Sequence, residues 1–224
     1  MTHSNHRRGN REDLVNDWVV FCFPSIDNPP EVHTKYRNIL AKHDPVCCTT
    51  TATIDGVGKR IRYAKYWDKK FDSGIHDSVT LEEFKNAEIT RGGSAVYDSK
   101  ESVQKVVNDL VDAELGLSVT VSGIFDEVFD ICEKAGIKAH TTNMSAETLG
   151  NMSLMPEPEI LEFTTMCGHA FVASNLVRHL LDRVKNGKMT PERASVEMAK
   201  QCTCNFFNVE RATRMINEYT AAHH

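Results

Sequence analysis

Residues 94–142 read SAVYDSKESVQKVVNDLVDAELGLSVTVSGIFDEVFDICEKAGIKAHTT, and this stretch decides the predicted fold. Apolar and polar residues alternate in three segments, as they do in half-buried strands: 94–97, 117–121 and 137–142. Between these segments, apolar residues recur at helical spacing over 103–111 and 124–132, and Asp98-Ser99-Lys100-Glu101 forms a capping box before the first helix. Arg91-Gly92-Gly93, just upstream, is typical of a flexible turn. The β-α-β-α-β order predicts an α/β fold or a split α+β sandwich.

Upstream of this core, the sequence predicts two helices and a β-hairpin. Five apolar residues fall on one face of a first helix: Leu14, Val15, Trp18, Val19 and Cys22. The second helix begins at Asn28-Pro29-Pro30 and ends at Asp44-Pro45. Segments 48–54 and 60–66 flank a turn that contains two glycines, and they predict the hairpin.

The C-terminal part of the chain becomes helical after Pro156 and Pro158. Its apolar spacing and capping residues predict a module of three helices over 168–186, 190–201 and 209–219. We therefore expect four regions: a disordered tail over 1–11, an α/β domain over 12–155, the helical module over 156–219 and the remnant of a purification tag over 220–224.

Composition narrows the class of protein. The 224 residues carry a net charge of -5, and no apolar run is long enough to span a membrane. Mild acidity argues against nucleic-acid binding, which needs a basic surface, and the polar N-terminus does not resemble a secretory signal. We expect a cytoplasmic protein whose partner is a small-molecule substrate rather than a nucleic acid or a membrane; assembly into a homo-oligomer is compatible with these features.

The seven cysteines are an odd number, which argues against a closed disulfide framework. Cys22 and Cys132 fall on apolar helix stripes and are interpreted as packing residues. Cys167-Gly168-His169 is predicted to begin the first module helix, whereas Cys202-Thr203-Cys204 lies between the second and the third. Because antiparallel helices return the chain to its starting end, these two segments are expected to meet.

Three interpretations of this set of side chains compete. Cys167, Cys202 and Cys204 could hold a [4Fe-4S] cluster with one iron left open. Alternatively, the same cysteines and His169 could bind Zn²⁺ as a Cys₃His site. The third interpretation has no metal and treats Cys202 and Cys204 as a redox pair or as core residues. Ligand type and spacing favour the cluster.

The leading functional hypothesis is an iron–sulfur enzyme of anaerobic metabolism, in which the open iron acts as a Lewis acid in a lyase, hydratase or desulfuration step. His169 is the expected proton carrier, and Asn205 or Asn208 would orient the substrate. Cys47 and Cys48 are candidates for an extra ligand or an active-site thiol. The alternative is a binding or regulatory protein in which zinc or a cluster is purely structural.

Overall fold

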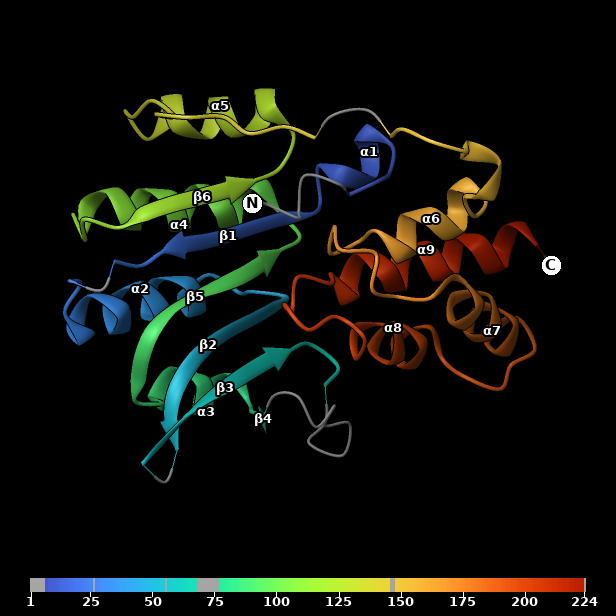
Figure 1. The fold of residues 1–224 in the computed structure, drawn as a ribbon, viewed down its shortest axis with the longest axis horizontal. Coiled ribbons are helices and arrows are strands. Elements are labelled where there is room, and N and C mark those ends of the chain that lie inside the picture. The colour runs from blue at the N-terminus through green and yellow to red at the C-terminus, as the bar shows by residue number, and fades with distance from the viewer. Residues whose placement is uncertain (1–6, 26, 55, 68–76, 146–147, 224) are drawn as a thin grey trace.

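The computed structural model describes residues 7–223 except for 26, 55, 68–76, 146 and 147. In this part of the chain, nine α-helices accompany one six-stranded mixed sheet (Figure 1). The strands are β1 (Trp18–Phe23), β2 (Cys47–Ile54), β3 (Val57–Ala64), β4 (Asp77–Ser78), β5 (Ile89–Tyr97) and β6 (Ser118–Ser122). Their order in the sheet is β4-β3-β2-β5-β1-β6. The mixed α/β class is therefore confirmed.

The helices follow the strands along the chain. They are α1 (Arg11–Leu14), α2 (Pro30–Lys42), α3 (Leu81–Asn86), α4 (Lys100–Asp112), α5 (Phe125–Lys134), α6 (Pro158–Thr164), α7 (Ser174–Lys185), α8 (Pro191–Ala199) and α9 (Val209–Ala222), with a 3₁₀ turn at Met152–Leu154. Side-chain caps mark several of their starts: Thr190 caps α8 and Asn208 caps α9, as predicted, whereas α4 is capped by Ser99, which accepts from the N–H of Ser102, in place of the predicted capping box. No helix in the described ranges combines the length and the apolar character that a bilayer requires.

Strand β1 lies between β5 and β6 and runs antiparallel to both. Strands β5 and β6 are therefore parallel, and α4 connects them across β1. In the same way, α2 connects β1 to β2 across β5. These are two split β-α-β units, so the predicted crossover helices are present but neighbouring strands are mostly antiparallel. Only the short β4 pairs in parallel, with β3.

The sheet has an apolar core on each face. On β1, Trp18, Val20 and Cys22 belong to the core that includes α2 and α4. The alternate residues Val19 and Phe21 belong to a second core, together with residues of α6 to α9. The helical module therefore packs directly on the sheet, at the side where Figure 1 shows α9 and α8 beside the strand ends.

Three local predictions are wrong. Residues 18–23 form β1 rather than a helix, because a strand buried on both faces lacks the alternation that identifies a strand. Residues 137–142 pair with no strand in the described part of the chain. Residues 91–93 are part of β5 rather than a flexible turn.

The ends of the chain and the module also differ from expectation. Residues 7–11 were expected to be disordered, yet the Arg7 guanidinium is almost fully buried against Asp17 and Asn10 caps α1; residues 1–6 lie outside the described residues. Helix α9 continues to Ala222, into the segment interpreted as a tag remnant. The module has a fourth helix, α6, so Cys167 lies in the turn between α6 and α7 rather than at a helix start.

Candidate metal centre

Two loops at the same end of the helical module bring four metal-ligating side chains together. The first loop joins α6 to α7 and carries Cys167 and His169; the second joins α8 to α9 and carries Cys202 and Cys204. Helix α7 leads away from the first loop and α8 returns to it, as the antiparallel arrangement predicts. We call these four residues the cysteine cluster.

Backbone conformation shapes both loops. Gly168 has a φ of 84° and Ala170 a φ of 56°, so the first loop turns tightly just after Cys167. Asn205 has a φ of 58° directly after Cys204. Asparagine is among the residues that adopt this left-handed conformation most readily. These turns place thiols separated by 35 residues of sequence next to each other.

The ligand atoms of the cluster lie within contact distance. The sulfur of Cys204 is 3.3 Å from that of Cys202 and 3.4 Å from Nδ1 of His169. The Cys167 sulfur is 4.0 Å from the same nitrogen. The ligand atoms of Cys167, His169 and Cys204 all lie within 4.8 Å of one another. The predicted convergence of the two segments is therefore confirmed.

The electrostatics of the cluster favour one thiolate. Hydrogen bonds from Cys202 and then Cys204 lower the pKa of Cys167, and the backbone N–H of His169 adds to this effect. Burial raises the pKa of Cys202, and the hydrogen bond to Cys167 raises that of Cys204. Three thiols in one place cannot all ionise unless a cation is present, and a bound metal ion is such a cation.

Several separations in the donor set are close to those of ligands around a single metal ion. Zn–S bonds of about 2.3 Å and Zn–N bonds of about 2.0 Å place tetrahedral ligand atoms roughly 3.5–3.8 Å apart. The separations of 3.3, 3.4 and 4.0 Å bracket that range. In a [4Fe-4S] cluster each thiolate binds a different iron, so the thiolates are farther apart than around one ion. Cys167, His169 and Cys204 can hold a metal, and Cys202 contacts Cys204 but lies outside the group whose ligand atoms are all within 4.8 Å of one another.

Asn205 and Asn208 both have structural bonds. The Asn205 amide donates to the carbonyls of Cys48 and Tyr63, at 3.0 and 3.2 Å, and so ties the Cys204 loop to the ends of β2 and β3. The Asn208 oxygen accepts from the N–H of Arg211 and caps α9, while its nitrogen donates to Asp17. Their proposed contact with substrate remains a prediction.

Cys47 and Cys48 are adjacent on β2 and face opposite cores. The Cys47 thiol points to the helical module and donates to the carbonyl of Asn205 at 3.1 Å. Burial raises its pKa, as it does that of Cys48. Cys47 therefore lies beside the second loop as a protonated donor, and Cys48 lies on the far side of the sheet.

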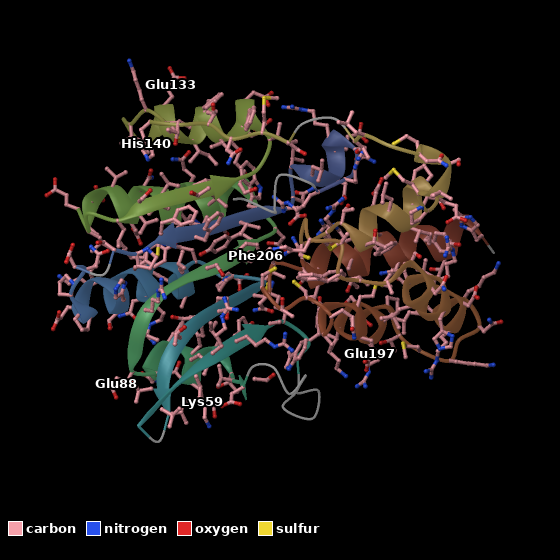
Figure 2. All side chains as sticks on the ribbon, viewed as in Figure 1. Lys59, Glu88, Glu133, His140, Glu197 and Phe206 are labelled. Carbon is pink, nitrogen blue, oxygen red and sulfur yellow. The ribbon has the colours of Figure 1, made fainter. Side chains whose placement is uncertain are left out.

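A cleft of about 220 Å³ opens next to the cysteine cluster. Cys204 and Phe206 form its module side, and the sheet forms its floor; Figure 2 shows Phe206 between the strands and the module helices. The sheet residues that line it include Phe21, Thr49, Thr51, Arg60, Arg91 and Ser94. Sequence reasoning did not identify the two arginines, because only the strand register places them near Cys204. We call this the Cys204 cleft.

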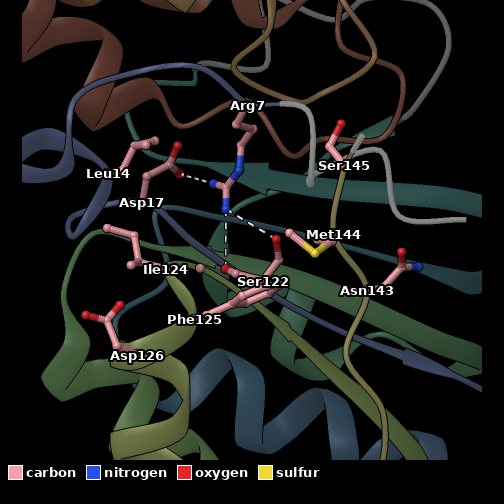
Figure 3. Close-up of a pocket in the computed structure, with 11 residues that line it drawn as sticks. Arg7, Leu14, Asp17, Ser122, Ile124, Phe125, Asp126, Asn143, Met144 and Ser145 are labelled. Atoms are coloured by element: carbon pink, nitrogen blue, oxygen red, sulfur yellow. Dashed lines mark hydrogen bonds and ion pairs between the residues drawn. The ribbon is translucent and has the colours of Figure 1, made fainter. Parts of the chain in front are cut away.

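A larger cavity of about 370 Å³ lies away from the cysteine cluster, between the N-terminal segment and the junction of β6 with α5. Figure 3 shows the Arg7 guanidinium paired with Asp17 and donating to Ser122. Asp126 at the same cavity pairs with Arg11. Charged groups of both signs thus pair within the protein here, and this cavity lacks the donor set of the cysteine cluster.

A buried ion-pair network joins the N-terminal segment to α9, and no local sequence pattern indicates it. Arg211 and Asp17 are both fully buried, and they pair at 2.9 Å. Arg211 also contacts Asp13, and Arg7 pairs with the other Asp17 oxygen at 2.7 Å. Burial opposes the charge of Arg211, but Asp17 and Asp13 outweigh it and raise the Arg211 pKa. We call these four residues the arginine cluster.

Comparison of the chain with protein families, with curated proteins and with solved structures finds no match. The geometry of the cysteine cluster and its cleft is therefore the basis on which a function can be proposed.

Proposed function

We propose that the protein is a metalloenzyme that acts on a small substrate in the Cys204 cleft. In this proposal Cys167, His169, Cys202 and Cys204 bind the metal. The observation that carries the proposal is the double position of Cys204, which belongs to the cysteine cluster and also lines the cleft. A small molecule in the cleft would therefore meet the metal centre directly, whereas a purely structural metal needs no such access.

The spacing of the ligand atoms favours zinc as the metal. Thiolate and imidazole ligands suit Zn²⁺, and the separations of 3.3–4.0 Å agree with one tetrahedral ion. When bound, such an ion would supply Lewis acidity for polarising a substrate oxygen or sulfur. An open position would require that one of the four residues give way to substrate, and Cys204 is the one that lines the cleft.

The second candidate is the [4Fe-4S] enzyme that the sequence predicts. It is favoured by the presence of three cysteines, of which one reaches the cleft, since three thiolates leave one iron of a cluster open. Binding a cluster would require the thiols to move apart from their present contacts. A lyase, hydratase or desulfuration reaction would suit that centre, with a hydroxyl, carboxylate or sulfur of the substrate at the open iron.

The side chains around the centre would hold the ligands and handle protons. His169 is half-buried and stacks on Phe171, with ring centroids 4.7 Å apart. This stacking fixes the imidazole plane with Nδ1 toward Cys204. In the zinc candidate His169 is a ligand; in the cluster candidate it remains the proton carrier. Asn205 keeps the Cys204 loop against the sheet in both.

The decisive experiment is metal analysis of protein purified without oxygen. We expect about one zinc per chain for the mononuclear site, or about four irons with sulfide and broad visible absorbance for a cluster. Cys204→Ser should lose most of the metal. The matched control is Cys132→Ser, because Cys132 is a half-buried free cysteine on α5.

Two results would overturn the proposal. One is a chain that binds neither zinc nor iron after supplementation and reconstitution. The other is a folded Cys202→Ser,Cys204→Ser double variant that keeps full metal content. Metal loss in the Cys132→Ser control would instead show that the assay reports general unfolding, and circular dichroism of each variant checks this.

A further inference from the structure

The face of the sheet toward the helical module changes from apolar to cationic over three rows of cross-strand neighbours. In the first row, Cys47 pairs with Ala64 and Val96, and all three are buried under the module. In the second row, Thr49 pairs with Arg62 and Ser94. Partners in a ladder share one face of the sheet, so each row points to the module side.

The third row lies beyond the module and contains two cations. Thr51 pairs with Arg60 on one side and with Arg91 on the other. Because β2 lies between β3 and β5, strand spacing places the Cα atoms of Arg60 and Arg91 about 10 Å apart. The rise along β2 from Cys47 to Thr51 places the third row about 13 Å from the first row. The row therefore lies at the far end of the Cys204 cleft, and both arginines line it.

A β-bulge places Arg91 in this row. Thr49 pairs with Ser94, but Thr51 pairs with Arg91, so β5 has one more residue than β2 between these pairs. A regular ladder would have paired Thr51 with Gly92 and turned Arg91 to the opposite face. Gly93 fits this bulge because a Cβ atom there would lie 2.9 Å from the carbonyl oxygen of Thr49.

The charge of the cleft has one sign. Its lining holds Arg60 and Arg91, the hydroxyls of Thr49, Thr51 and Ser94, and no carboxylate among the described residues. Both arginine side chains are exposed, and neither forms an ion pair within residues 7–25, 27–54, 56–67, 77–145 or 148–223. Guanidinium groups recognise carboxylate and phosphate oxygens through paired N–H donors.

We propose that the Cys204 cleft binds a small organic anion through Arg60 and Arg91. The charged group of the ligand is a carboxylate or a phosphate, and the remainder extends along Thr49 and Ser94 toward Cys204. This assignment rests on the proposed function only for the end that meets the metal centre. Anion binding at the arginines is independent of whether the metal is present.

Calorimetric titration of the full chain with malonate and with inorganic phosphate tests the proposal. We expect millimolar or tighter binding of at least one probe, and the tighter one identifies the charged group. Arg60→Gln and Arg91→Gln should each weaken it about tenfold, since each removes charge-assisted hydrogen bonds. Lys59→Gln is the matched control: Lys59 pairs with Ala52, so it is next to Arg60 on β3 but on the opposite face of the sheet.

The outcomes separate this proposal from the metal site. Binding of neither probe by the wild-type chain, or equal weakening in Lys59→Gln and Arg60→Gln, would overturn it, because the second result would reflect net charge alone. The titration is repeated on Cys204→Ser. Arginine-dependent binding that persists without the metal supports the anion site even where metal analysis has disproved the metalloenzyme.

Discussion

The arginine cluster and the cysteine cluster are both buried and polar, but they differ in what surrounds each group. In the arginine cluster, opposite charges alternate: Arg211 meets Asp17 and Asp13, and Asp17 meets Arg7. In the cysteine cluster, thiol meets thiol and thiol meets imidazole. The first arrangement is complete within the chain, whereas the second gathers groups that a cation would stabilise. Of these two buried polar clusters, the cysteine cluster is therefore the candidate ligand site.

The largest expected effect comes from breaking the arginine cluster. Arg211→Met should lower the free energy of unfolding by about 3–5 kcal/mol, because it leaves the buried Asp17 with one cation fewer. Urea denaturation measures the loss. The control is Arg178→Met, which removes an exposed pair with Glu157 and should cost less than about 1 kcal/mol. Equal losses in the two variants would contradict the structural role of the cluster.

Removal of a bound metal is the second test of the difference between the arginine cluster and the cysteine cluster. If a metal is bound at about 100 times its dissociation constant, a chelator should lower the free energy of unfolding by about 3 kcal/mol. This loss should add to that of Arg211→Met, because the two clusters share no side chain. The measurement is thermal unfolding of both proteins with and without chelator. A chelator effect that disappears in Arg211→Met would show that the clusters are not independent.

The metal affinity should fall with acidification. Thiols and imidazole bind a metal only after they lose their protons, so lower pH favours the free, protonated side chains. Titration of metal release between pH 8 and about pH 5 checks the sign. Constant metal content over this range would contradict ligation by these four residues.

Two substitutions at Asn205 separate the effect of backbone conformation from the effect of hydrogen bonding in the loop between α8 and α9. Asn205→Gly keeps the left-handed backbone but loses the bonds to Cys48 and Tyr63, and we expect a cost of about 1–2 kcal/mol. Asn205→Ala should cost about 1 kcal/mol more, because alanine disfavours a φ of 58°. Urea denaturation of both variants measures the difference, and metal analysis shows how far the loop positions Cys204. Equal stability of the two variants would contradict the conformational role.

The smallest effect is expected at the cysteines of β2. Cys47→Ala should keep full metal content and cost about 1 kcal/mol, because its thiol donates to the Asn205 carbonyl. Cys48→Ala is the matched control on the opposite face of the same strand. Metal analysis and urea denaturation compare the two. Loss of metal in Cys47→Ala alone would make Cys47 a ligand and would enlarge the cysteine cluster to five residues.

The sequence predicted those parts of the molecule that depend on local pattern. Caps and apolar spacing located α2, α4, α5, α8 and α9 within a few residues. The expectation that α8 returns antiparallel to α7 correctly predicted that Cys167 and Cys204 lie close together. Strand β1 was missed because Trp18, Val19 and Val20 are buried on both faces and lack alternation. The segment 137–142 alternates, but no strand within the described ranges pairs with it.

The cleft and the arginine cluster could not have been predicted in this way. Arg60 and Arg91 share a face only through the register of three strands and a bulge, and Arg211 meets Asp17 across 194 residues of sequence. No local sequence pattern indicates either of these contacts, since each depends on how distant segments of the chain are aligned. The candidate metal ligands were easier to recognise because few other uses account for clustered cysteines in a chain with free thiols.

The bulge in β5 makes the charge of the cleft depend on chain length as well as on residue type. Deletion of one glycine between Arg91 and Ser94 would only remove the bulge and leave Arg91 opposite Thr51 in a regular ladder. Insertion of one glycine there, with the bulge kept, would instead turn the Arg91 guanidinium to the other side of the sheet without changing any other side chain. Insertions and deletions are usually tolerated in loops and rejected in strands. At this position, lengthening the strand by one residue would remove one of the two arginines of the proposed anion site in a single step.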